Sequence, residues 1–321
     1  MSEEVKPVLI GGLPRPFKFS RILVKVNEGK IGKNDFESIY ADYLKRTILR
    51  LKKIGINNIV HGLYLWDDLF SPFSSSVKGM RQGPLFRFFD NNFYYRIPVI
   101  ENSIKLENPV TVDWYKSNMQ IAGEFGFHVH AMLPGPLTFA LMSENKYYSS
   151  MKDLIIDLAS VLHTEASALV EKGAKIVELH EPFLIKITDT PTLELFKEAL
   201  LRLKNNLDVK IWVQTYFGPA FHVLSIKNVY DILGLDFTSI QEPLTNLRNF
   251  DVKDVALAVG LVDSRNTKME RVSILKSLVK EIIKMKPKEF FITPSSMMDF
   301  IPESVAFKKL RVLVKSSRKV R

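Results

Sequence analysis

The segment KIVELHEP, residues 175–182, is typical of a short buried strand that ends in polar residues. Its apolar residues come first, and His180, Glu181 and Pro182 follow where the chain would leave a sheet. The residues before it, from Ser150 to Gly173, repeat apolar side chains at the spacing of one helix face. A helix followed by a buried strand is the repeating unit of a parallel sheet covered by helices.

The same alternation continues along the chain, with further helices predicted over 35–54 and 272–285. An eight-stranded α/β barrel commonly takes about 250 residues or more, so the 321 residues fit one domain. We therefore predict a single (β/α)8 barrel over 1–321, with a loop insertion at 67–110 after the second strand. The predicted strands are 7–12, 58–66, 128–134, 175–182, 210–218, 237–243, 256–263 and 289–296.

Composition restricts the chemistry more than it restricts the fold. The chain contains no cysteine, which excludes disulfides, thiolate zinc sites and cysteine nucleophiles. We expect a cytoplasmic protein, because the sequence shows neither a signal peptide nor a membrane-length apolar run. The net charge of +10 favours acidic partners. Part of this charge lies in a predicted basic C-terminal tail at 308–321, either solvated or a docking segment.

Polar or glycine-bearing clusters follow most of the predicted strands. In a barrel, the carboxyl ends of all strands open at one mouth, so these clusters are expected to converge into a ligand site. Each cluster alone also has a structural explanation, since Asp and Asn cap helices and Gly and Pro turn the chain. The catalytic residue remains unassigned, with His180, Glu181 and Asp263 as acid/base candidates.

No common metal or phosphate motif is present. The sequence lacks a His-Glu-x-x-His helix, a GxxxxGKS/T loop and a GxGxxG loop. His128 and His130 form an HxH pair early in a predicted strand, where alternation turns both side chains to one side and away from the rim of the mouth. Structural or surface roles are the expectation for this pair, and no metal site is predicted.

Several segments together resemble one known family over nearly the whole chain. GGLPRP (11–16), FRFFDNNFYYRIP (86–98), PGPLTFALMS (134–143) and VELHEPFL (177–184) occur in the order of the N-terminal half of cobalamin-independent methionine synthase. TYFG (215–218), VGLVDSRNT (259–267) and TPSSMMDFIP (293–302) continue the match. The resemblance implies a barrel of the methionine synthase and uroporphyrinogen decarboxylase type.

The resemblance also implies that two barrels have different roles in the reaction. In the family, the C-terminal half binds zinc through His, Cys, Glu and Cys and activates the homocysteine thiol for methyl transfer. Here the corresponding strand ends read Gln214-Thr215, Gln241-Glu242 and Ser295-Ser296, so zinc is expected only in a partner. The chain is then an N-terminal-type subunit that pairs with a separate catalytic barrel and binds a methyl-pterin such as methyltetrahydrofolate.

Basic residues of the N-terminal half are thought to hold the acidic tail of this pterin. Arg87 matches the family's lysine, Asp90 and Asn92 match in type, and the segment after LPRP aligns imperfectly. His180 replaces the family's Asp, whereas Glu181 matches. The residues that the resemblance assigns to substrate or tail binding are Arg15, Lys18, Arg21, Arg87, Asp90, Asn92, Tyr216, Arg265 and Asn266.

Two other functions remain open. An autonomous, metal-free barrel enzyme related to uroporphyrinogen decarboxylase could use Glu181, Asp263 or Arg265 on an anionic substrate. A structural or regulatory protein could instead touch nucleic acid through the basic tail, but the sequence contains no nucleic-acid-binding motif. A membrane partner is not expected.

Overall fold

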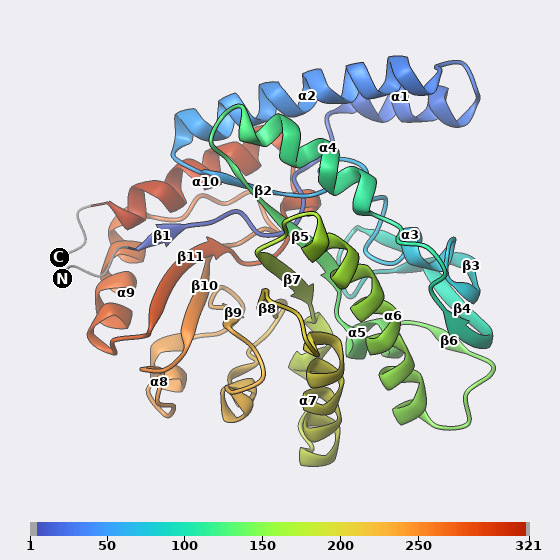
Figure 1. The fold of residues 1–321 in the computed structure, drawn as a ribbon. Helices are drawn as coiled ribbons and strands as arrows, with labels where there is room; N and C mark the ends of the chain where they lie inside the picture. Colours follow the sequence, from blue (N-terminus) through green and yellow to red (C-terminus); the bar gives the residue numbers. More distant parts are fainter. Residues whose placement is uncertain (1–4, 319–321) are drawn as a thin grey trace.

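A computed structural model describes residues 5–318 of the chain. Eight parallel strands form one curled sheet in the order β1-β11-β10-β9-β8-β7-β5-β2, with helices on its outer side (Figure 1). This confirms the predicted α/β barrel architecture. The strands are β1 (Lys6–Pro7), β2 (Asn58–Val60), β5 (His128–Pro134), β7 (Ile176–His180), β8 (Lys210–Gln214), β9 (Ile232–Asp236), β10 (Ala256–Val262) and β11 (Glu289–Pro294).

The sheet is closed by a side chain between its two end strands. β1 pairs only with β11, and β2 pairs only with β5. Asn58, which is buried, accepts a hydrogen bond from the Leu9 N–H at 3.0 Å and donates one to the Leu9 carbonyl at 2.7 Å. The amide therefore satisfies the two backbone groups that a neighbouring strand would otherwise pair.

The outer helices bury one apolar stripe each, as the 3.6-residue period requires. Gly55 ends α2 in the left-handed conformation, with φ of 102°. Ser150 accepts a hydrogen bond from the Asp153 N–H and caps α6. The longer helices are α1 (Phe17–Asn27), α2 (Lys33–Ile54), α4 (Val112–Gly123), α6 (Met151–Glu171), α7 (Thr190–Lys204), α9 (Val272–Lys284) and α10 (Glu303–Ser317).

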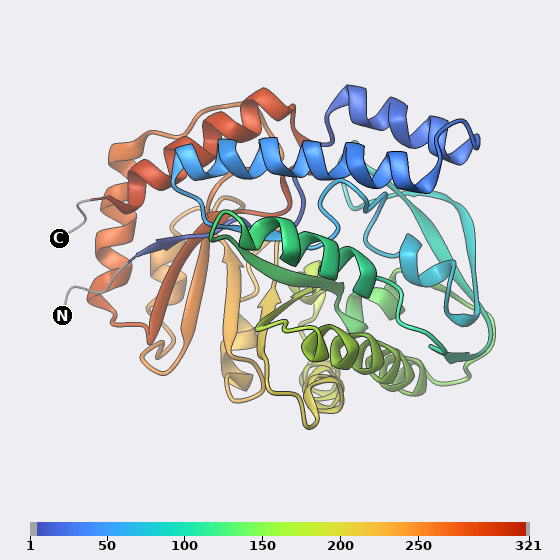
Figure 2. The same cartoon turned by 45° about the horizontal axis from the view of Figure 1, so that its top comes forward.

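Short elements and one hairpin make up the remaining structure. Within the predicted insertion at 67–110, β3 and β4 pair as a long antiparallel hairpin, which projects from the same side of the barrel as α1 (Figures 1 and 2). No helix among the described residues has the length and apolar content of a membrane-spanning segment. The short elements and the hairpin strands are α3 (Ser71–Ser74), β3 (Lys78–Arg87), β4 (Tyr94–Lys105), α5 (Pro136–Leu141), β6 (Glu144–Asn145), η1 (Pro182–Lys186), η2 (Phe221–Ile226), α8 (Pro243–Leu247) and η3 (Met298–Phe300).

Several predicted segments differ from the structure. The first strand is 6–7 and not 7–12, and the second is 58–60 and not 58–66. The sixth strand is 232–236 and not 237–243, because the Asp236 carboxylate bonds Thr238 and the Phe217 N–H and turns the chain at that point. The basic segment 308–321 is not a tail over its described part. Residues through Ser317 belong to α10, whose Leu310, Leu313 and Val314 are buried, and 319–321 lie outside the described residues.

Candidate functional site

The interior of the barrel holds a carboxylate between two histidines. Glu178 on β7 lies 2.7 Å from Nδ1 of His130 and 3.4 Å from Nε2 of His180, and it also accepts the Gly11 N–H at 3.0 Å. Burial alone would raise the pKa of Glu178, but the hydrogen bonds and charges of the two histidines lower it to about 2. The carboxylate is therefore ionised and links the segment after β1 to β5 and β7 inside the barrel.

Glu181 directly follows His180, at the carboxyl end of β7. Its two carboxylate oxygens accept the backbone N–H groups of Leu137 and Thr138, at 3.0 and 2.8 Å, in the first turn of α5. A Cβ atom on Gly135 would lie 2.1 Å from this carboxyl group, so only glycine leaves room for it. Burial raises the pKa of Glu181 to about 7, although the hydrogen bonds oppose the rise.

A second acidic group and two unpaired polar atoms lie near Glu181. Burial raises the pKa of Asp299 to about 7, and the positive charge of Arg15 opposes this rise. Burial and the charges of Glu181 and Asp299 also raise the pKa of Tyr216 well above its ordinary range. The Tyr216 hydroxyl and Nδ1 of His180 are buried without a hydrogen-bond partner in the described structure, and the two rings are 5.7 Å apart.

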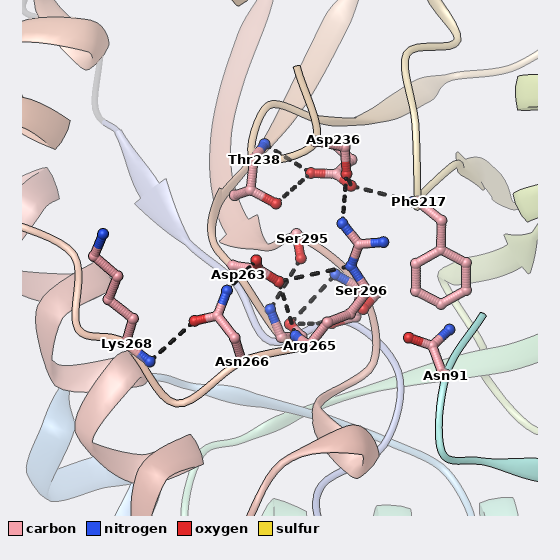
Figure 3. A network of polar contacts seen from close by, with 12 residues as sticks. Asn91, Phe217, Asp236, Thr238, Asp263, Arg265, Asn266, Lys268, Ser295 and Ser296 are labelled. Carbon is pink, nitrogen blue, oxygen red and sulfur yellow. Dashed lines mark hydrogen bonds and ion pairs between the residues drawn. The ribbon is translucent and has the colours of Figure 1, made fainter. Parts of the chain in front are cut away.

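The loop after β10 presents Arg265 at the mouth. Arg265 donates to the Ser239 hydroxyl at 3.1 Å, lies 3.8 Å from the Asp263 carboxylate, and places its guanidinium 5.4 Å from the centre of the Phe217 ring (Figure 3). Asn266 donates to the other Asp263 oxygen. Asp263 thus orders the loop through these contacts.

An ion pair between Lys309 and Glu270 also holds the loop after β10 in place. The Lys309 ammonium, on α10, is fully buried and lies 2.6 Å from Glu270 Oε1. That oxygen also accepts the Asp263 N–H at 2.9 Å, and Lys309 donates to the Lys268 carbonyl at 2.6 Å. The position of Asp263, and with it that of Arg265, therefore depends on α10.

Aromatic rings from the hairpin cover the mouth. The connection between β3 and β4 carries Phe88, Phe89 and Phe93. These rings pack against one another and against Phe217 and Phe300, with ring centres 5.2 to 6.4 Å apart. Phe89 and Phe217 both have positive φ, 51° and 74°, which is costly for bulky residues. The surrounding packing must hold this arrangement in place.

A cavity of about 400 Å³ remains outside these rings. Phe89 and Phe217 supply its aromatic wall, and Lys186 and Arg265 supply its positive charge. The Lys186 ammonium lies 5.4 Å from the centre of the Phe89 ring and 5.2 Å from that of Phe183. Flat rings beside two cations are suited to a planar ligand that carries negative charge. The cavity is lined by Phe89, Asp90, Asn91, Ile185, Lys186, Phe217 and Arg265.

The predicted binding residues separate into two groups. Asp90 and Arg265 line the mouth cavity, Asn266 lies beside it on the Asp263 loop, and Tyr216 is buried beneath the aromatic rings. Arg87 is exposed and donates to the Asn91 carbonyl at 2.9 Å, which shapes the hairpin connection.

The remaining predicted residues have structural or exposed positions. Arg15 donates to the carbonyls of Tyr64 and Trp66 and lies 2.9 Å from the Asp67 carboxylate, so its guanidinium is held by the loop after β2. Lys18 and Arg21 are exposed on α1, and Asn92 is exposed on the hairpin connection. None of these four lines the mouth cavity.

The strand ends that correspond to the family's zinc site do not fit a zinc ion. Thr215 donates to the Gly234 carbonyl, and Gln214 is hydrogen-bonded to Trp212 and to the Thr215 carbonyl. Glu242 is exposed, and Ser295 and Ser296 bond to Ser264. Across residues 5–318, no three His, Asp or Glu side chains form a group that could hold a metal. The donor set of a thiolate zinc site is missing.

Comparison with known proteins identifies the family. The model of the cobalamin-independent synthase N-terminal domain matches residues 77–286. The chain belongs to this family. Among curated relatives, the methionine synthase of Sulfurisphaera tokodaii is 27% identical over 98% of this chain and 91% of its own length. That of Pyrococcus furiosus is 24% identical over 98% of this chain and 92% of its own length.

Solved structures of B12-independent methionine synthases share the fold. The protein from Shewanella sp. W3-18-1, in complex with selenomethionine, superimposes with a TM-score of 0.81 at 17% identity, over 99% of this chain and 98% of that one. The putative enzyme from Listeria monocytogenes gives a TM-score of 0.77 at 16% identity over 99% of both chains. These likenesses establish the methionine synthase barrel architecture.

Sequence reasoning missed the residues whose role depends on contacts across the barrel. Glu178 and Asp236 are buried carboxyl groups on β7 and β9, and Asp299 is a partly buried one in η3, where the surrounding apolar residues dominated the pattern. Lys186 is the last residue of η1 and belongs to no sequence motif. Only Glu178 could have been noticed in the sequence, because an acidic residue in a buried strand needs a polar partner. His130 on the neighbouring strand β5 lies two residues from Met132, which is paired with Glu178.

Proposed function

We propose that this chain is the binding component of a methionine synthase made of two separate barrels. In this proposal it binds a methyl-pterin with an acidic tail, and a zinc-bearing catalytic barrel activates the thiol acceptor. The family match supports the methionine synthase assignment. The strand ends described above support a role without zinc, because they offer no thiolate or imidazole set for the ion.

The mouth cavity carries the proposal. It combines the rings of Phe89 and Phe217 with the cations Lys186 and Arg265, while its one carboxylate, Asp90, lies on the hairpin connection. A pterin ring offers a flat face, and a glutamate tail offers several carboxylates that pair with cations. Arg265 is the central residue, because the Lys309–Glu270 pair and Asp263 fix its loop.

Binding of pterins with different tails tests this role. We expect a methyl-pterin with three glutamates to bind more tightly than one with a single glutamate, by calorimetry on the full chain. Arg265→Ala should remove most of this difference, about fivefold in affinity, because it removes one partly exposed cation. Lys280→Ala is the control, since this exposed lysine of α9 does not line the cavity. Equal affinity for the two tails would contradict the proposal.

One observation favours a second candidate, an autonomous metal-free enzyme. Glu181 and Asp299 both have a pKa of about 7 and lie near the unpaired Tyr216 hydroxyl and His180. Groups with a pKa near neutrality are suited to proton transfer. Turnover of an anionic substrate by the purified chain alone, lost in Asp299→Asn, would establish this function. A cytoplasmic location is part of both proposals.

A further inference from the structure

A second cavity lies at the amino ends of the strands, opposite the mouth. Its volume is about 700 Å³, which is within the range of small-molecule sites. It is present because β1 has only two residues and does not pair with β2, so the barrel wall is thin between them. The start of β5 and the residues after α2 and α4 form its sides.

Two rings that are almost completely buried, Phe291 and His130, form the inner wall of this cavity, and Trp212 lies fully buried behind them. Trp212 and Phe291 lie with ring centres 5.3 Å apart at 43°, and the His130 ring lies 6.0 Å from Trp212. All three side chains are fixed by the barrel, because His130 is hydrogen-bonded to Glu178 and the Trp212 N–H donates to Gln214. A rigid wall of flat rings binds a planar ligand without an ordering cost.

The charged residues around the cavity are all basic. Among residues 5–318, Lys6, Lys52 and Lys175 line it together with His128, and no Asp or Glu does. Lys6 is already paired with Glu289 at 3.5 Å, and within the described residues Lys52 donates only to the Phe125 carbonyl. Lys175 forms no ion pair in the part of the chain that the structure describes. Lys52 and Lys175 are therefore the cations available to a ligand.

We propose that this cavity is a ligand site for a planar aromatic carboxylate, separate from the mouth. The ring system would lie against Phe291 and His130, behind which Trp212 is fully buried, and the carboxylate would face Lys52 and Lys175. The proposal does not depend on the methyl-pterin role, because the two cavities share no lining residue.

The probe is 2-naphthoate, with uncharged 2-naphthamide as its matched control. With about 13 non-hydrogen atoms, naphthoate should bind the full chain with a dissociation constant of about 1 mM or below. The double variant Lys52→Glu and Lys175→Glu should weaken naphthoate binding about tenfold and leave naphthamide unchanged. Lys280→Glu, which reverses an exposed charge on α9, should leave both ligands unchanged.

Tryptophan fluorescence locates the bound probe. The chain has three tryptophans, and Trp66 and Trp114 lie against each other at 5.5 Å, apart from Trp212. Because Trp212 is in the cavity lining and Trp66 and Trp114 are not, quenching by naphthoate should be lost in Trp212→Phe, whose fold can be checked by its thermal unfolding. Quenching that persists in this variant would overturn the proposal, as would equal affinity for naphthoate and naphthamide or the absence of saturable binding.

Discussion

Glu181→Gln tests whether burial or hydrogen bonding determines the pKa of the carboxyl group at the mouth. Two backbone N–H groups favour the ionised form of Glu181, and complete burial favours the neutral form. Burial outweighs the hydrogen bonds and raises the pKa from 4.5 to about 7. Since each pH unit of such a rise corresponds to about 1.4 kcal/mol, the group contributes about 3 kcal/mol of pH-dependent stability.

The sign of this contribution follows from the raised pKa. The folded state binds the proton more tightly than the unfolded chain, so the stability is fully present below about pH 4.5 and is lost as the pH rises through about 7. Glutamine cannot titrate, so the variant should lack this loss. At pH 5 the variant should be less stable by about 1–2 kcal/mol, because its NH2 group faces a backbone N–H, and by pH 8.5 this deficit should disappear.

Urea unfolding at pH 5 and pH 8.5, followed by circular dichroism, measures the difference. Glu178 does not contribute in this window, because its pKa of about 2 leaves it ionised throughout. The raised pKa of Asp299 acts with the same sign in both proteins and cancels in the comparison. Glu171→Gln, at an exposed position of α6, is the control. If wild type instead gains stability relative to Glu181→Gln between pH 5 and 8.5, hydrogen bonding dominates and the reasoning is wrong.

Three further substitutions test the contacts that close the barrel and hold the mouth. Asn58→Leu should lower the free energy of unfolding by about 2–6 kcal/mol, because it leaves the Leu9 N–H and carbonyl without partners; a loss below about 1 kcal/mol in urea unfolding would contradict the bridging role. Lys309→Met should cost about 3 kcal/mol by leaving Glu270 unpaired, and adding Glu270→Gln should recover part of it; no recovery would argue against the ion pair. Wild type should lose the stability that ionised Glu178 contributes as the pH falls from about 4.5 through about 2, and Glu178→Gln should not show this loss. An identical fall in the free energy of unfolding in both proteins would refute this.

The barrel and its long helices could be predicted from the sequence because their signals are local. Apolar spacing located α2, α6 and α9, and Gly55 and Ser150 marked helix ends by chemistry that acts within one turn. The sixth strand was misplaced because the apolar and β-branched residues of 237–240 resemble a strand. The Asp236 side chain turns the chain at that point, and a side-chain contact of this kind leaves no periodic signal.

The candidate site was predictable only in outline. Convergence of the strand ends follows from parallel topology, and Arg265 and Asn266 after β10 do lie at the mouth. Asp90 was assigned by resemblance, and it lies there on the connection between β3 and β4. Arg15 was assigned to a ligand by resemblance, yet the structure shows it bound to the loop after β2. The basic run at 308–317 looked like a solvated tail, whereas Lys309 is buried against Glu270, a pairing that spans 39 residues of sequence.

The rate of methionine formation tests the two-barrel proposal most directly. The chain would be mixed with a zinc-bearing catalytic barrel, homocysteine and a methyl-pterin with three glutamates, and product would be measured with each protein alone and with both. The proposal predicts that the chain alone is inactive and that the mixture is faster than the catalytic barrel alone. Methionine formation by the pure chain with tightly held zinc, or a mixture no faster than the catalytic barrel, would contradict it.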